Sequence, residues 1–81
     1  MKKYILFIKE SCPFCVLALE LLEELGLEYS VITVNGNIIL AEQVKKAFDW
    51  RTFPIVLLQD EDSLKLIGGF TDLESIVIND E

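Results

Sequence analysis

Apolar and polar residues follow one another in blocks, and each block has the length and period of one secondary-structure element. Residues 4–8 form a continuous apolar, β-prone run, which is typical of a strand covered on both faces and central in its sheet. Pro13 suits the first turn of a helix, and between residues 16 and 25 the only polar side chains are three glutamates on one face. Gly26 then predicts the end of this helix.

The middle of the chain predicts a second strand and a second helix. Residues 27–34 are β-prone, and the helix before them makes a right-handed parallel crossover to the first strand the expected connection. Asn37 is a preferred helix cap, and the helix is expected to run to about residue 49. Apolar residues recur there at helical spacing and predict one buried face: Leu40, Val44, Ala47 and Phe48.

The last third predicts two antiparallel strands and a final short helix. Residues 54–58 read as a strand that begins with proline, where a missing backbone donor is tolerated. After an acidic turn, residues 64–67 return as its antiparallel partner. Thr71 or Asp72 is expected to cap a helix over residues 73–78. The predicted order is β-α-β-α-β-β-α, an α/β fold with a four-stranded mixed sheet and three helices.

Length and charge restrict the class of protein. The 81 residues, 52% of them apolar, suit a single domain over residues 1–81, and no apolar run reaches the roughly 20 residues that span a bilayer. A net charge of -7 argues against a nucleic-acid surface. The apolar run after Lys2 and Lys3 is short and lacks a small-residue cleavage site, so we expect a cytoplasmic protein and no membrane partner.

The candidate chemistry lies in the only two cysteines, Cys12 and Cys15, which stand where the first strand passes into the first helix. A cysteine at a helix N-terminus meets unsatisfied N–H groups and the positive end of the helix dipole, which favour thiolate over thiol. Cys12 is therefore the expected nucleophile. Cys15, one turn inward, is expected to stay a thiol until it resolves a mixed disulfide on Cys12. Lys9 would add positive potential.

Two other interpretations of the cysteine pair remain open. Cys12 and Cys15 would also suit a buried or inert pair, although a four-residue loop constrains little of the unfolded chain. The pair supplies half of many zinc sites, but the chain has no histidine and no further cysteine to complete one. A metal site would need ligands from outside the chain, so no metal is expected.

Four motifs together resemble glutaredoxins over essentially the whole chain. They are Lys9 before the cysteines, the run Cys12, Pro13, Phe14 and Cys15, the run Thr52, Phe53 and Pro54, and the run Gly68, Gly69, Phe70, Thr71 and Asp72. The resemblance implies a thioredoxin-like fold and a dithiol active site that uses glutathione as co-substrate. Phe14 stands where tyrosine is common in the family, and Phe53 is bulkier than the usual valine.

The resemblance also implies a glutathione groove beside Cys12. In it Pro54 would be cis, and the Phe53 backbone would pair with the backbone of glutathione. Lys9, with Arg51 as a weaker candidate, would bind the glycine carboxylate. The remaining implied contacts are the Phe14 ring, the turn at Gly69, the Thr71 and Asp72 N–H groups for the γ-glutamyl carboxylate, and the Asp72 carboxylate for the γ-glutamyl ammonium. From the residues alone, Asp72 is as well explained as a helix cap, Gly68 and Gly69 as a plain turn, and Trp50 and Arg51 by packing and solvent contact.

Three functions are consistent with these residues. The first is a glutathione-dependent thiol–disulfide oxidoreductase that reduces protein disulfides and glutathionylated proteins through Cys12 and Cys15. The second is a thioredoxin-like reductant that a flavoprotein reductase recharges. The third is an iron–sulfur carrier that uses Cys12 and glutathione in a dimer, against which Pro13 and Cys15 both argue. We expect a monomer; ribonucleotide reductase is a family-level client to which no particular residue points.

Overall fold

The apolar runs of the sequence form one mixed sheet with helices on both faces. The computed structural model describes residues 2–80, except for the side chains of residues 79 and 80. The element order is β1 (Lys3–Ile8), α1 (Pro13–Glu24), β2 (Tyr29–Thr33), α2 (Ile38–Phe48), β3 (Ile55–Gln59), β4 (Leu64–Gly68) and α3 (Phe70–Asp80). This order and the mixed sheet confirm the predicted fold class. Within residues 2–80, no helix has both the length and the apolar character needed to cross a membrane.

The strands lie in the order β2-β1-β3-β4, so β1 is central as its apolar sequence predicts. β1 pairs in parallel with β2, with Tyr4 opposite Tyr29, and in antiparallel with β3, with Leu6 opposite Val56. β4 completes the sheet as the antiparallel partner of β3, with an irregularity between Val56 and Leu57. Because β1 and β3 are antiparallel, the end of β1, which leads to the cysteines, lies beside the start of β3, which follows Pro54.

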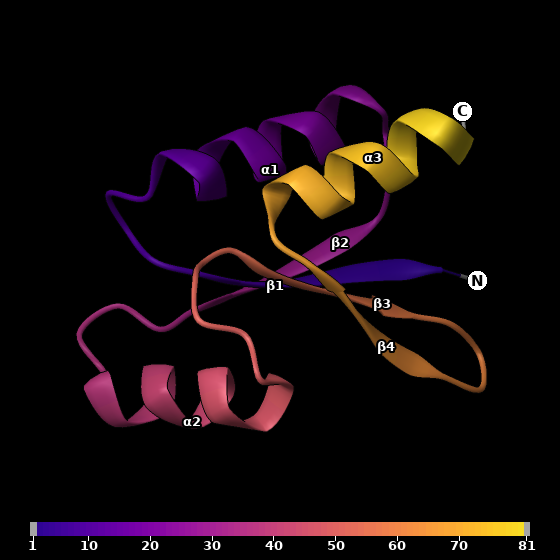
Figure 1. Cartoon of the computed structure of the whole chain (residues 1–81). Coiled ribbons are helices and arrows are strands. Elements are labelled where there is room, and N and C mark those ends of the chain that lie inside the picture. Colours follow the sequence, from indigo (N-terminus) through magenta and orange to yellow (C-terminus); the bar gives the residue numbers. More distant parts are fainter. Residues whose placement is uncertain (1, 81) are drawn as a thin grey trace.

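Helices α1 and α3 cover one face of the sheet and α2 covers the other (Figure 1). Because side chains alternate along a strand, β1 contributes side chains to both faces of the sheet. Tyr4 and Leu6 pack into the larger core with residues of α1, β3 and α3, namely Ala18, Leu22, Val56, Leu58, Leu73 and Val77. On the opposite face, Phe7 meets Phe48 of α2, with ring centroids 6.1 Å apart. The larger core fixes α1 and α3 beside each other, and both helices contribute to the site.

Helix α3 begins three residues earlier than predicted. Its first residue is Phe70, and the N–H of Leu73 donates to the carbonyl of Gly69 at 3.0 Å, which makes Gly69 the cap. The Asp72 carboxylate accepts the Gly69 N–H at 3.0 Å, so Asp72 stabilises the helix from inside its first turn. The prediction missed this start because it required the capping side chain to precede the helix.

Two other details differ from the predictions. On α2, Ala41 and Val44 are buried and Ala47 is exposed, because the helix turns a slightly different face to the sheet than its apolar spacing suggested. The second strand, predicted over residues 27–34, is confined to Tyr29–Thr33. Neither difference moves the segments that carry the predicted site residues.

Candidate active site

Cys12 occupies the N-cap position of α1. Ser11 before it has a left-handed backbone with φ of 60°, and Pro13 fills the first helical position, so the chain turns sharply into the helix. The Cys12 backbone is extended, and its Sγ accepts the N–H of Cys15 at 3.3 Å. One of the N–H groups at the start of α1 is thus aimed at the sulfur. Cys12 is partly exposed and can therefore reach a substrate disulfide.

Cys15 lies one turn inward and is only 1% exposed. Burial is the main reason that the pKa of its thiol rises from 9.0 to about 12, and the hydrogen bond and negative charge of Cys12 raise it further. The backbone hydrogen bond and the charge of Lys9 act in the opposite direction. Burial beside Cys12 therefore favours the protonated form of Cys15.

The loop before β3 brings a backbone carbonyl to the nucleophile. The Phe53–Pro54 peptide bond is cis, as predicted. The Cys12 thiol donates to the Phe53 carbonyl at 3.5 Å between sulfur and oxygen, across 41 positions of sequence. Pro54 is buried at the start of β3, which holds this loop against the sheet. Phe53 is thus the residue through which the run Thr52, Phe53 and Pro54 reaches Cys12.

A hollow of about 270 Å³ lies beside this contact and contains most of the predicted groove. The loop before β3 and the start of α3 both contribute to its lining, together with Phe14 of α1. The rings of Phe14 and Phe70 stand 6.0 Å apart in its wall. Its lining residues are Phe14, Trp50, Thr52, Phe53, Pro54, Gly69, Phe70, Thr71 and Asp72. Six of the eight residues predicted for the glutathione groove therefore meet in one place.

Lys9 and Arg51, the other two predicted residues, lie beside this hollow and do not line it. The Lys9 Nζ stands 5.4 Å from the centroid of the Phe53 ring, close enough for a cation–π contact. Arg51 lines an adjacent hollow of about 350 Å³ that also contains Lys45 and Trp50. Positive side chains therefore lie near the hollow, as predicted for the glycine end of glutathione, but Phe53 and Trp50 lie between these charges and the hollow.

Lys45 of α2 is a cation that the sequence analysis missed. Its Nζ lies 5.6 Å from the centroid of the Phe53 ring, which therefore has two ammonium groups near it. Lys45 also forms an ion pair with Glu42 at 3.6 Å. Nothing in the local sequence could have singled it out among the two adjacent lysines of α2. Only the packing of α2 against the sheet decides which of them faces Phe53.

The start of α3 forms the far wall of the hollow. Thr71 and Asp72 occupy its first turn, where backbone N–H groups have no partner within the helix. Gly68 has φ of 128°, and a Cβ added there would lie 2.5 Å from the Asp72 Oδ2. Asp72 thus stabilises the helix from inside its first turn and also lines the hollow, while its contact with glutathione stays a prediction.

Trp50 has a larger part in the site than solvent contact and packing. It lines both the hollow beside Cys12 and the one beside Arg51. Its Nε1 is buried and has no hydrogen-bond partner among the described residues. A Cβ added at Gly69 would lie 3.7 Å from this nitrogen, an ordinary van der Waals distance, so the start of α3 packs beside the indole. A tryptophan directly before a predicted binding motif is the signal that could have identified it.

The described residues contain no cluster of three or more His, Cys, Asp or Glu side chains placed to hold a metal ion. The Cys12 sulfur forms hydrogen-bond contacts with the Cys15 N–H and the Phe53 carbonyl. The arrangement is a reactive thiol at a helix start, a buried second thiol, and a groove with cations at one end and helix N–H groups at the other. Such a site can exchange disulfides and bind a small anionic thiol.

Known proteins agree with this geometry. The family model described as Glutaredoxin matches residues 4–62. Chicken glutaredoxin-1 is 34% identical over 77 residues, covering 91% of this chain and 72% of its own length. A probable monothiol glutaredoxin 2 of Rickettsia typhi is 33% identical over 84 residues, covering 98% of this chain and 72% of its own length.

Solved structures share the fold. A wheat glutaredoxin has a TM-score of 0.73 at 27% identity, over 96% of this chain and 73% of its own. A buckwheat glutaredoxin–glutathione complex has a TM-score of 0.74 at 19% identity, over 98% of this chain and 71% of its own. With the fold, the helix-capping cysteine and the cis proline in place, the chain belongs to the glutaredoxin family.

Proposed function

We propose that this protein is a glutathione-dependent thiol–disulfide oxidoreductase that works through both cysteines. The observation that carries the proposal is the contact between Cys12 and the Phe53 carbonyl, which places the nucleophile at the edge of the hollow. Membership of the glutaredoxin family supports thiol–disulfide exchange as the reaction. The substrates proposed are glutathionylated proteins and proteins with disulfides.

The reaction begins with attack of the Cys12 thiolate on one sulfur of the substrate disulfide. A bond forms between Cys12 and that sulfur, the substrate S–S bond breaks, and the leaving thiolate takes up a proton. Cys15 then loses its proton and attacks Cys12, which releases the second substrate thiol. The substrate gains two electrons, and the protein is left with a Cys12–Cys15 disulfide. Two molecules of glutathione return it to the dithiol and leave as glutathione disulfide.

The groove suits glutathione in charge and in shape. Glutathione carries a carboxylate at each end, and the hollow has the Thr71 and Asp72 N–H groups on one side and the Lys9 ammonium across Phe53 on the other. Helix N-termini bind carboxylates well. The Asp72 carboxylate can meet the γ-glutamyl ammonium while it keeps its bond to the Gly69 N–H, since a carboxylate accepts several hydrogen bonds. The buckwheat neighbour was solved as a glutathione complex.

Cys15 supports a dithiol route, although relatives from Rickettsia are named monothiol glutaredoxins. Here the second cysteine is present, buried one turn from Cys12, and its N–H donates to the Cys12 Sγ. This geometry suits an internal attack on a mixed disulfide held by Cys12. When Cys12 holds glutathione in a mixed disulfide, a second molecule of glutathione would resolve it, and Cys15 would take no part.

The test compares two electron sources for the same protein. With a small glutathione mixed disulfide as substrate, the protein is assayed with glutathione and glutathione reductase, and separately with thioredoxin reductase. We expect turnover with glutathione. Turnover with thioredoxin reductase alone would instead establish the thioredoxin-like alternative.

Two variants test the separate roles of the cysteines. Cys12→Ser should abolish turnover of every substrate. Cys15→Ser should keep reduction of the small glutathione mixed disulfide and lose most reduction of a protein disulfide. Equal loss of both activities in Cys15→Ser would contradict the division of roles.

A further inference from the structure

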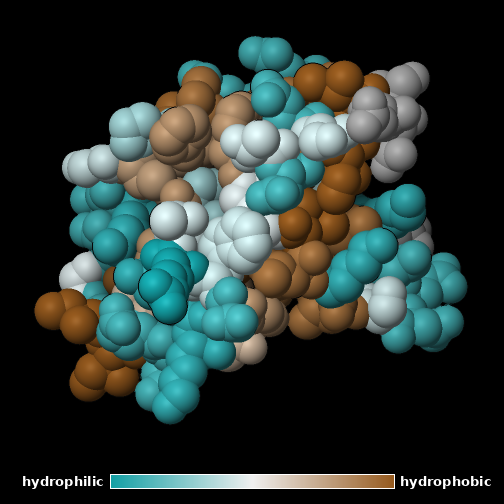
Figure 2. Space-filling model, viewed as in Figure 1, coloured by the Kyte–Doolittle hydropathy of each residue, from teal (hydrophilic) through white to brown (hydrophobic). Residues whose placement is uncertain are grey.

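The first turns of α1 expose apolar side chains directly beside the nucleophile. Phe14 is 56% exposed, Val16 53% and Leu17 43%, although all three are large and apolar. In Figure 2, brown and tan surface lies over the N-terminal part of α1. Clustered apolar exposure of this kind marks an interaction surface more often than isolated exposed residues do. The groove described above uses only Phe14 of these three.

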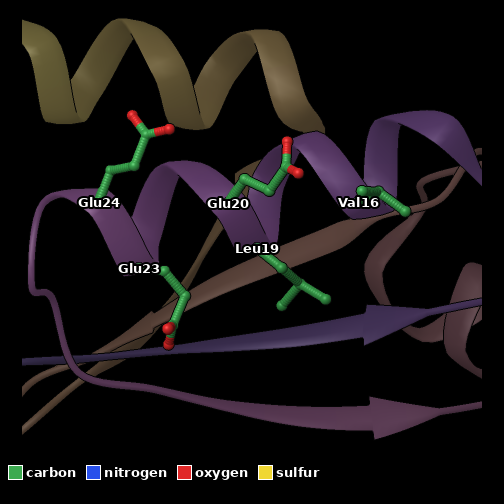
Figure 3. A pocket seen from close by; sticks show the side chains of 5 residues that line it. All are labelled: Val16, Leu19, Glu20, Glu23 and Glu24. Carbon is green, nitrogen blue, oxygen red and sulfur yellow. The ribbon is translucent and has the colours of Figure 1, made fainter.

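Acidic side chains continue the same face of α1. Residues three and four apart are neighbours on the surface of a helix. Val16 and Leu17 are therefore adjacent to Glu20. Glu20 is in turn adjacent to Glu23 and Glu24. A hollow of about 370 Å³ is lined by Val16, Leu19, Glu20, Glu23 and Glu24. Figure 3 shows Glu20 and Glu24 directed toward α3 and Glu23 directed toward the sheet. Helix α1 has no basic residue that would neutralise the glutamates from within.

We propose that this face of α1 binds a segment of the client protein that has apolar side chains next to its disulfide-forming cysteine and a lysine or arginine farther along. The proposal rests on the proposed function, because the client sulfur must reach Cys12. Glutathione would take the opposite side of Cys12, over Phe53 and the start of α3. The α1 side is then the one left for the polypeptide.

The charge of the face decides between occupants. Three glutamates on one helix of a chain with net charge -7 repel acidic peptides and anionic lipid surfaces and attract cations. The apolar start of the face needs apolar partners, and the acidic end needs a basic one. A segment with both, in this order from its cysteine, fits the whole face.

The helix sets the spacing of that basic residue. Glu20 and Glu24 lie eight and twelve residues beyond Cys12, which is roughly 12 and 18 Å along a helix axis. An extended peptide covers about 3.3 Å per residue. The basic side chain should therefore stand about four or five residues from the client cysteine.

The experiment uses short peptides that carry one glutathionylated cysteine with leucine beside it. In one pair, lysine stands about five residues after the cysteine or about five before it, since the face does not fix chain direction. A second pair has glutamate at those positions. Each rate, as kcat/KM, is divided by the rate of the same protein with a small glutathione mixed disulfide. This ratio isolates docking from chemistry.

The double variant Glu20→Gln with Glu24→Gln tests the surface, and the pair Glu28→Gln with Asp62→Asn, at exposed positions that do not line this hollow, is the charge-matched control. Glu23 is left intact because it accepts a hydrogen bond from Tyr29 at 2.7 Å. We expect at least one lysine peptide to be preferred over its glutamate partner by about threefold to tenfold at low salt, as exposed ion pairs allow. The double variant should lose this preference, and added salt should weaken it.

Other results would overturn the proposal. Equal ratios for lysine and glutamate peptides, or a preference that survives in the double variant, would show that α1 does not select basic segments. A dimer that dissociates on Val16→Lys would make a second copy of the chain the occupant. If the unmodified protein fails with the small mixed disulfide as well, the proposed function fails and not only the docking surface.

Discussion

The titration of Cys15 links the buried dithiol to the stability of the whole fold. Burial and the neighbouring Cys12 raise the pKa of the folded Cys15 thiol to about 12, from 9.0 for an ordinary thiol. Because the unfolded chain releases this proton first as pH rises, the free energy of unfolding must fall. The contribution is fully present below about pH 9 and is lost as pH rises toward about 12.

The size of the loss follows from the two pKa values. The full difference corresponds to about 4 kcal/mol, and about 2 kcal/mol of it is lost by roughly pH 10.5. Cys15→Ala removes the titrating group. The cavity left by Cys15→Ala lowers stability by an amount that does not depend on pH. This amount therefore cancels when the free energies of unfolding of one protein at two pH values are subtracted.

The assay is urea unfolding of the reduced protein at about pH 8 and about pH 10.5, for the unmodified chain and for Cys15→Ala. We expect the unmodified chain to lose about 2 kcal/mol more than the variant between the two values. The hydrogen bond of Tyr29 to Glu23 raises the pKa of the Tyr29 hydroxyl, but Tyr29 is present in both proteins, so its contribution cancels. Equal losses in the two proteins would refute the claim that burial keeps Cys15 protonated.

Three further predictions concern the groove. Asp72→Ala should destabilise the fold by about 1 kcal/mol in urea unfolding, since it leaves the Gly69 N–H without its partner. Asp72→Asn should keep most of the stability but raise KM for glutathione. Equal losses of stability in the two variants would argue that the Asp72 side chain does not cap the helix. Gly68→Ala should destabilise more than Asp72→Ala, because it adds backbone strain to a clash with Asp72, and a thermal midpoint unchanged from the unmodified chain would contradict this. Lys45→Met should raise KM for glutathione severalfold with little change in kcat if its ammonium beside Phe53 helps to attract a carboxylate, and an unchanged KM would confine it to packing.

Elements with a strong local signal were predicted well. The apolar run at residues 4–8, the proline that begins α1 and the asparagine that caps α2 each act through their own backbone or immediate neighbours. The same holds for Cys12, whose role as cap depends only on where α1 begins. Local physics was enough to order the elements and to identify the dithiol.

Features that depend on packing between distant segments were not predicted. Whether Lys45 or Lys46 faces Phe53 depends on how α2 rotates against the sheet, and Ala47 was misplaced for the same reason. The early start of α3 depends on a carboxylate that reaches back to the cap, a pattern that the capping rule used for the sequence does not include. Trp50 stands just before a predicted motif in the sequence, but that its indole lies beside Gly69 depends on how the start of α3 packs against this loop.

Trp50 gives the protein a built-in optical reporter. It is the only tryptophan of the chain, and it lines the hollow beside Cys12 with its indole nitrogen buried and without a hydrogen-bond partner among the described residues. Indole emission responds to local polarity and to nearby sulfur, so one unlabelled fluorophore lies where a bound thiol and the state of the dithiol can both alter its signal. Occupancy and redox state can thus be followed in real time in the unmodified chain.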